Sequence, residues 1–227
     1  MVAHRNTSFQ PLPRPLGLAP YHYDLTEHFP DIAQSITAAK KMVFHVVGDS
    51  GGVKDAEFQG NVAEQMVEQL HAGGAGTPRF CYHVGDVVYF TGAKDEYYGQ
   101  FYEPYGHYDV PIFSIPGNHD GEVDDPSAQT SLDGWVQYFM QAHPDVDPIS
   151  KDAPRVQLNQ PNVYWTLIAA EGFSKSSTAA TAAMRGSKGR MMSATRAIVP
   201  PLLIRSSTMT IRAPGHGRTP SICLCLP

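Results

Sequence analysis

Three apolar segments of this chain each run directly into a short polar turn that contains glycine, and this repeated junction most constrains the fold. The first segment, MVFHVV, is rich in β-branched side chains. The segments and their turns are residues 42–47 with 48–52, residues 79–84 with 85–90, and residues 111–115 with 117–120. Continuous apolar runs of this length are typical of buried parallel strands. The pattern therefore predicts a parallel sheet whose strands end in polar turns.

The segments between these strands have helical periodicity. In residues 58–71, Val62, Met66 and Leu70 fall on one face, which is typical of an amphipathic helix. The other expected elements are helices at 31–41, 94–105 and 132–142 and a late strand at 163–169, while the Pro-rich residues 1–30 are expected to be irregular. Alternating strands and helices indicate an α/β domain with a mostly parallel sheet.

The strand ends bring chemically active side chains to one edge of the sheet, because the carboxyl ends of parallel strands lie together. Asp49, Asp86, Asn118 and His119 all occupy such positions. The side-chain oxygens of the two aspartates and the asparagine suit a hard cation, and the histidine would lie beside that cation as a proton donor. Asp120 is expected to support the loop that carries His119. The alternatives are that the two aspartates cap helices and that His119 is an ordinary turn residue.

The three turns, GDSGG, GDVVYFTG and GNHD, together resemble the calcineurin-like metallophosphoesterases, and among these the purple acid phosphatases. Most of that superfamily has Asp-x-His in its first motif, whereas here Gly51 stands two residues after Asp49. Purple acid phosphatases also lack this histidine, and a tyrosine three residues after the second-motif aspartate replaces it. Tyr89 follows Asp86 at that spacing. The chain departs from the branch at Ser50, where tryptophan is usual.

This resemblance implies a role for each matching residue. Asp49 would bind the first metal ion, Asp86 would bridge both ions, and Tyr89 would bind the first ion as a phenolate. Asn118 would bind the second ion through its amide oxygen, and His119 would protonate the leaving alkoxide or hold the substrate. The alternative for Tyr89, from its residue type alone, is ordinary aromatic packing.

The resemblance also implies a partial metallophosphoesterase-type β-sandwich flanked by helices, with a dinuclear metal centre at the carboxyl ends of the strands. The metals would be iron paired with iron, zinc or manganese. The expected reaction is hydrolysis of a small-molecule phosphomonoester by attack of a metal-bound hydroxide. A phosphodiesterase acting on nucleotides or phospholipids is the alternative enzyme.

Two later histidine motifs of the family have no match in this chain. They are a strand-end histidine and a Gly-His-x-His turn, whereas only His119, His143 and His216 follow Asn118. An inactive fragment, or a metal-binding remnant without catalysis, therefore remains an alternative function.

The composition changes abruptly near residue 172. All 22 Asp and Glu residues precede it, whereas residues 174–227 contain eight Lys or Arg, no acidic residue and no aromatic residue. We therefore expect three parts: an irregular segment at 1–40, the metallophosphoesterase domain at 41–172, and a poorly packed basic tail at 173–227. A basic binding arm is one interpretation of the tail, although the tail lacks a dense basic cluster. We favour out-of-frame translation, because the composition switches abruptly rather than grading as it would in a linker.

The remaining features concern partners and compartment. The chain has no run of 18 apolar residues and no apolar signal-peptide region at its start, so no membrane span and, by default, a cytoplasmic location are expected. Three cysteines are too few for a disulfide framework, and a nucleic-acid partner is not expected. His45, His83 and Cys81 lie within apolar strands and are expected to be core residues. The aromatic residues between 97 and 105 are expected to pack in the core as well.

Overall fold

The computed structural model describes residues 10–52, 56–123, 125–127, 129–169 and 207–212. Its main sheet has four strands in the order β4–β3–β2–β6. These strands are β2 (Lys41–Val47), β3 (Cys81–His83), β4 (Ile112–Ser114) and β6 (Ser207–Arg212). The strands β2, β3 and β4 are parallel, and β6 runs antiparallel to β2. This arrangement confirms the predicted α/β class and the three predicted strands that precede the polar turns.

A second, two-stranded sheet pairs β1 (His22–Asp24) in parallel with β5 (Thr166–Ile168). β5 lies within the late strand expected at 163–169. In contrast, β1 and the short helix α1 (Leu25–His28) form regular structure where the prolines had predicted none. β1 gains a distant partner strand, which no local pattern shows. The start of α1 is local: the Asp24 carboxylate accepts a hydrogen bond from the Thr26 amide.

Aromatic rings join the two sheets. Phe113 on β4 makes edge-on contacts with Tyr23 on β1 and with Trp165, which directly precedes β5. The Tyr23 and Trp165 rings also contact each other. Such edge-to-face pairs add about 0.5–1.5 kcal/mol each beyond the area they bury. The partial sandwich is therefore held together by ring packing at its centre.

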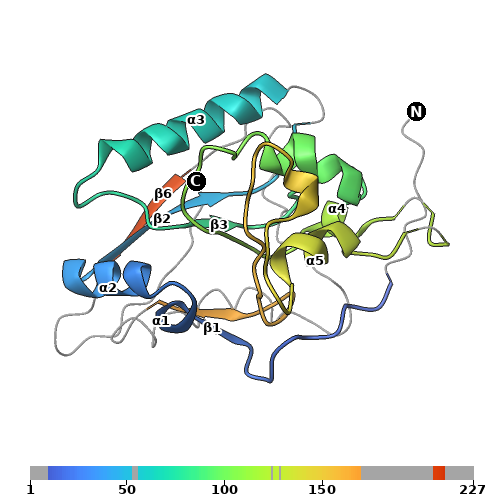
Figure 1. Cartoon of the computed structure of the whole chain (residues 1–227), viewed down its shortest axis with the longest axis horizontal. Helices are drawn as coiled ribbons and strands as arrows, with labels where there is room; N and C mark the ends of the chain where they lie inside the picture. The colour runs from blue at the N-terminus through green and yellow to red at the C-terminus, as the bar shows by residue number, and fades with distance from the viewer. Residues whose placement is uncertain (1–9, 53–55, 124, 128, 170–206, 213–227) are drawn as a thin grey trace.

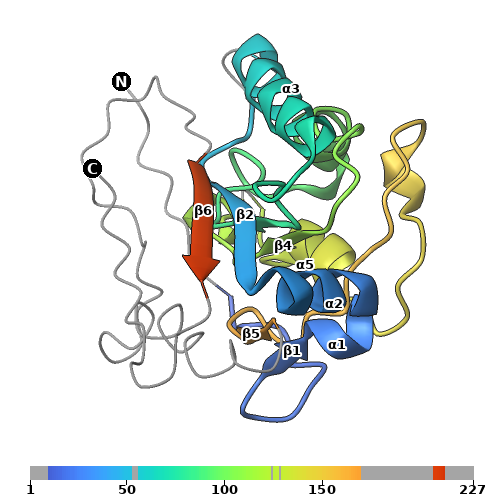
Figure 2. The same cartoon turned by 90° about the vertical axis from the view of Figure 1, so that its left-hand side faces the viewer.

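Helices flank the main sheet: α3 lies above it, and α1 and α2 lie below it, in both Figures 1 and 2. The strand β1 also lies below the main sheet in these views. The bounds are α2 (Pro30–Ala39), α3 (Ala56–Ala72), α4 (Asn118–Gly121) and α5 (Asp133–Phe139), with a 3₁₀ turn at Pro148–Ser150. Three of these correspond to helices predicted from periodicity. The fourth prediction, a helix at 94–105, is wrong in type, because a 3₁₀ turn at Lys94–Glu96 is followed by a π-helical turn at Tyr98–Tyr102.

The π-helical turn belongs to a buried segment. Tyr97, Phe101, Tyr102 and Tyr105 are all buried, which confirms that this aromatic cluster packs in the core. Gln100, in the middle of the turn, is also buried and bonds to the backbone of a site loop.

The predicted core residues are confirmed. Cys81 is a buried free thiol. The His45 ring lies 2.8 Å from the Tyr108 hydroxyl and 2.9 Å from the Gln69 side-chain oxygen, and the His83 ring is 2.7 Å from the Ser50 hydroxyl. Burial without a charge partner lowers the pKa of both histidines, that of His83 to about 3. Both rings are therefore neutral core groups.

The tail is described only in part. Residues 207–212 pair with β2 over the register Lys41↔Arg212 to Val46↔Ser207, which differs from the expectation of a poorly packed tail. The rest of 173–227 lies outside the described residues, as do His216, Cys223 and Cys225. The out-of-frame interpretation stays a prediction. Within the described part of the chain, no helix is both long enough and apolar enough to cross a membrane.

Candidate metal centre

The first two polar turns are bonded to each other through their backbones. The Asp49 amide donates to the Gly85 carbonyl oxygen at 3.1 Å, and the Ser50 amide donates to the Asp86 carbonyl oxygen at 3.2 Å. These bonds extend the pairing of β2 with β3 past the strand ends. Asp49 and Asp86 both have left-handed backbone conformations, with φ of 51° and 52°, which aspartate tolerates better than most residues. The two carboxylates are thus presented from adjacent, matching turns.

The third turn lies against the second because both contain glycine. A side chain at Gly117 would collide with the Asp86 carboxylate and amide, and a side chain at Gly85 would lie 2.6 Å from the Gly117 amide nitrogen. Gly85 also has a φ of 109°, which L side chains rarely adopt. At this short separation the His119 amide donates to Asp86 Oδ1 at 2.9 Å. The glycines therefore allow direct contact between the two turns.

The side chain of Asp120 links the same two turns through hydrogen bonds to their backbones. Its carboxylate is fully buried and accepts three backbone hydrogen bonds, from Val87 at 2.9 Å, Val88 at 3.2 Å and Gly117 at 2.8 Å. Burial raises the pKa of this carboxyl to about 7, and the three amides act in the opposite direction. Asp120 therefore joins the turn that carries His119 to the second turn, and its role in supporting the site stays a prediction.

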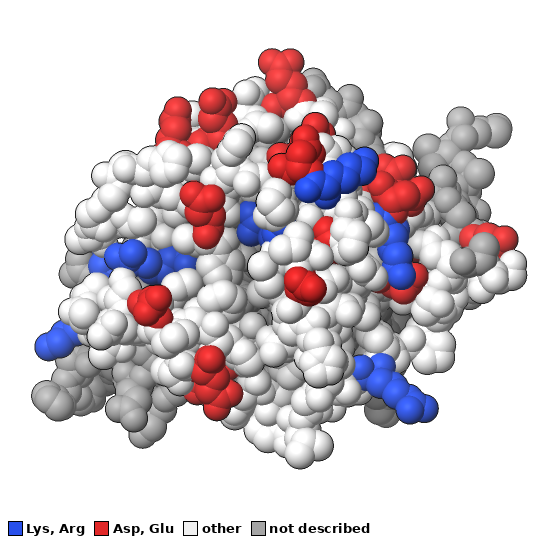
Figure 3. Space-filling view, in the orientation of Figure 1, with Lys and Arg blue, Asp and Glu red and all other residues white. Residues whose placement is uncertain are grey.

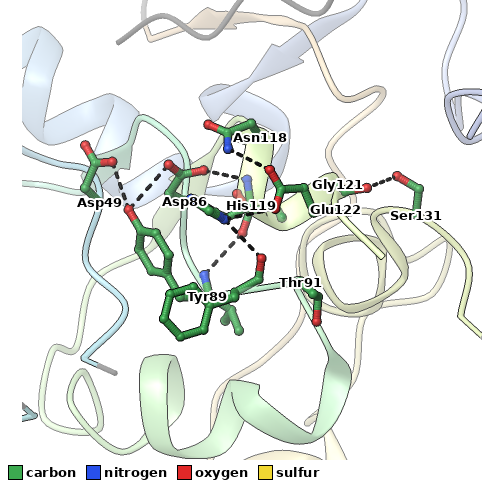
Figure 4. A network of polar contacts seen from close by, with 12 residues as sticks. Asp49, Asp86, Tyr89, Thr91, Asn118, His119, Gly121, Glu122 and Ser131 are labelled. Atoms are coloured by element: carbon green, nitrogen blue, oxygen red, sulfur yellow. Dashed lines mark hydrogen bonds and ion pairs between the residues drawn. The ribbon is translucent and has the colours of Figure 1, made fainter. Parts of the chain in front are cut away.

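The phenol of Tyr89 lies between the two aspartates (Figure 4). Its hydroxyl is 3.0 Å from Asp49 Oδ1 and 3.4 Å from Asp86 Oδ2. Neither aspartate adjoins the start of a described helix, since α3 is described from Ala56 and Asp86 is followed by a turn. The structure thus brings three of the predicted site residues into one oxygen cluster.

The electrostatics of this cluster favour a cation. Burial raises the pKa of Asp86, and the Asp49 charge adds to the rise, while His119 opposes it. Burial also raises the pKa of Tyr89, and the charges of Asp86 and Asp49 raise it further. Tyr89 therefore remains a neutral phenol beside two carboxylates unless a strong positive charge is added. A set of carboxylate and phenol oxygens suits a hard metal ion, so these residues fit the predicted cofactor.

Asn118 and His119 adjoin the cluster from α4. The Asn118 amide nitrogen donates to Glu122 Oε1 at 3.2 Å, so its oxygen is turned away from Glu122 (Figure 4). The His119 ring packs beside the Tyr89 ring with centroids 4.5 Å apart, and its Nδ1 is 3.0 Å from the Phe90 carbonyl oxygen. The structure therefore places all the predicted site residues in one region, with Asn118 and His119 beside the cluster.

Histidine ligands are absent from this cluster. The described residues contain no group of three or more His, Cys, Asp or Glu that could hold a metal ion. His143 lies exposed in a loop, and His216 falls outside the described residues. The candidate ligand set therefore consists of two carboxylates, a phenol and an amide.

Sequence reasoning missed Gln100, which fixes the backbone of Tyr89. The Gln100 side chain accepts from the Tyr89 amide at 2.9 Å and donates to the Tyr89 carbonyl oxygen at 2.8 Å. The sequence did contain a signal for this role: Gln100 is a single glutamine within an aromatic segment that was expected to be buried, and a buried amide needs hydrogen-bond partners.

The departure at Ser50 also has a structural explanation. The Gly85 amide donates to His83 Nδ1 at 3.2 Å, so the neutral ring carries its proton on Nε2. That nitrogen is 2.7 Å from the buried Ser50 hydroxyl, to which it donates. A small hydroxyl residue at position 50 thus packs against the His83 ring beside the first two polar turns.

Comparison with known proteins bears on this region of the chain. A family model described as calcineurin-like phosphoesterase matches residues 42–170, which include all three turns. Searches of curated proteins and of solved structures found no match.

Proposed function

This chain belongs to the calcineurin-like phosphoesterase family, a family of metal-dependent phosphoester hydrolases, and we propose that it is a phosphomonoesterase of the purple acid phosphatase branch. The observation that carries the proposal is the position of the Tyr89 hydroxyl between Asp49 and Asp86, in a chain with glycine where most of the superfamily has histidine. The matched residues 42–170 support a domain at 41–172.

In this proposal the oxygen cluster holds a dinuclear centre of iron with iron, zinc or manganese. Asp49 and Tyr89 would hold the first ion, Asp86 would contribute to both, and Asn118 would hold the second through its amide oxygen. When bound, such a pair lowers the pKa of coordinated water and neutralises charge on the phosphoryl group. The raised pKa of Tyr89 means that its deprotonation depends on binding of the first ion.

His119 is the proposed general acid. Its Nδ1 is held by the Phe90 carbonyl oxygen, which can only accept, so Nδ1 carries a hydrogen and Nε2 is the nitrogen left for the substrate. A proton on Nε2 would pass to the leaving alkoxide oxygen as the ester bond breaks. General acid catalysis of this kind contributes about 10²- to 10⁴-fold in rate.

The proposed substrate is a small phosphate ester. Asp and Glu side chains are scattered over the face shown in Figure 3, and the described residues on this face form no continuous band of Lys and Arg. Nucleic-acid binding depends strongly on such basic surfaces. This face therefore offers no support for a nucleic-acid partner.

A non-catalytic metal-binding remnant is the second candidate. The absence of a cluster of three His, Cys, Asp or Glu among the described residues favours it, because the family reaction depends on a well-held metal pair.

The test is hydrolysis of an aryl phosphate monoester and of the matching diester by the full chain, after loading with iron and zinc or with manganese. We expect metal-dependent turnover that is faster for the monoester and is lost in Asp86→Asn. Faster diester hydrolysis would make the chain a phosphodiesterase. Metal binding without turnover of either ester would favour the remnant.

A further inference from the structure

One acidic residue contacts both Asn118 and His119 and has no role in the predicted site. Glu122 follows α4, and its amide donates to the Asn118 carbonyl oxygen at 3.0 Å. Four residues is about one helical turn, so the two side chains lie on the same face. The Glu122 side chain is 17% exposed, and its two oxygens contact different partners.

The first contact decides which end of the Asn118 amide is free. Glu122 Oε1 accepts from the Asn118 amide nitrogen at 3.2 Å. The opposite orientation would place the amide oxygen against a carboxylate, where neither group can donate. The carboxylate therefore holds the nitrogen and leaves the oxygen, the only metal-binding atom of this side chain, pointing away from Glu122 (Figure 4).

The second contact is to the catalytic candidate. Glu122 Oε2 lies 3.4 Å from His119 Nδ1, the same nitrogen that bonds to the Phe90 carbonyl oxygen. His119 Nδ1 thus faces two acceptors, the Glu122 carboxylate and the Phe90 carbonyl oxygen, which hold this edge of the imidazole ring in place. The ring is thereby oriented with Nε2 on its other side.

From these contacts we propose that Glu122 is a positioning residue, which holds the Asn118 amide with its oxygen available to the second metal ion. The inference rests on the proposed function, because it assumes that Asn118 is a ligand. Residues that orient metal ligands typically change metal affinity by about 10- to 100-fold when they are replaced.

Two substitutions at this position separate orientation from simple packing. Glu122→Ala removes both acceptors and frees the amide to rotate. Glu122→Gln keeps one carbonyl oxygen for the Asn118 nitrogen, while its own NH₂ group faces His119 Nδ1–H. The glutamine variant should therefore retain most of the metal affinity that the alanine variant loses. Glu64→Ala removes an equal charge from an exposed position on α3 and serves as the control.

The experiment is calorimetric titration of the metal-free full chain with Mn²⁺ alone. We expect weaker binding by about 10- to 100-fold in Glu122→Ala, near wild-type binding in Glu122→Gln and in Glu64→Ala, and no further loss when Glu122→Ala is added to Asn118→Ala. Circular dichroism of each variant would show that the fold is retained. If Glu122→Ala disrupts the fold, the Mn²⁺ affinities of Glu122→Gln and Asn118→Ala decide the question. Near wild-type affinity in Glu122→Gln with weaker binding in Asn118→Ala supports the role of Glu122, and equally weak binding in both contradicts it.

The two proposals fail differently. Normal Mn²⁺ affinity in Glu122→Ala, or an equal loss in the Asn118→Ala background, would overturn the role of Glu122 and leave the metal centre intact. Absence of Mn²⁺ binding by the wild-type chain would overturn the metal centre, and the role of Glu122 with it.

Discussion

Replacement of Asp120 by asparagine should make the protein relatively more stable as the pH rises. The native carboxyl is fully buried, and burial raises its pKa to about 7 from the ordinary value of 3.8. A folded-state pKa above the unfolded value means that the native state holds the proton more tightly. Ionisation of this group therefore removes stability as the pH rises through the interval between the two values.

The size of the effect follows from that interval. A rise of about three pKa units corresponds to about 4 kcal/mol, since each unit is worth 1.36 kcal/mol. Most of this stability is present near pH 4 and is lost by about pH 8. Asparagine has the same shape as the neutral carboxyl and retains one oxygen for the Val87 and Val88 amides. Its NH₂ group faces the Gly117 amide, a loss of one hydrogen bond that does not depend on pH. The variant should lack the pH-dependent loss.

The assay is urea unfolding of wild type and Asp120→Asn across this pH range, with a chelator present so that metal binding does not contribute. Groups that do not interact with Asp120 affect both proteins alike, so the difference between the two free energies of unfolding reports Asp120 together with its electrostatic coupling to Asp86. That difference should shift by about 4 kcal/mol in favour of the variant between about pH 4 and about pH 8. If the free energies of unfolding of the two proteins change equally with pH, the reasoning is refuted.

Three further variants test the close packing, the buried charge and a buried hydrogen bond of the site. Gly117→Ala should reduce metal affinity and activity together, because the added methyl group collides with Asp86; unchanged affinity on titration with Mn²⁺ would contradict this. Asp86→Asn should abolish activity yet raise the free energy of unfolding at neutral pH without metal, since burial raises the pKa of the native carboxyl; a destabilised variant in urea unfolding would be the opposite result. Ser50→Ala should lower stability by about 1–3 kcal/mol, because the buried His83 N–H loses its acceptor, and an unchanged unfolding midpoint would count against that hydrogen bond.

The elements that could be predicted from sequence are those with a strong local signal. Strand β2 is a continuous apolar run, and α3 has a clear apolar face, so both are found close to where they were expected. Strands β1 and β6 could not be predicted, because each depends on a partner more than 100 residues away. No local pattern encodes such a pairing.

The candidate site follows the same division. Asp49, Asp86, Asn118 and His119 could be grouped in advance, because parallel strands bring their carboxyl ends to one edge. Tyr89 was added to this group only by the family resemblance. Gln100 and Glu122 could not be grouped in advance, since what matters is which distant or neighbouring group their side chains reach. In Glu122 a weak signal was present, because it stands four residues after a candidate ligand at a helical spacing.

The central claim is that Asp49, Asp86 and Tyr89 hold a metal ion, and the ultraviolet difference spectrum of a metal titration tests it most directly. Tyr89 is neutral in the metal-free protein, so binding of Fe(III) should produce the spectrum of one deprotonated tyrosine. The signal should be absent in Tyr89→Phe and in Asp86→Asn. Binding with no tyrosinate signal in wild type, or with the same signal in Tyr89→Phe, would contradict the account.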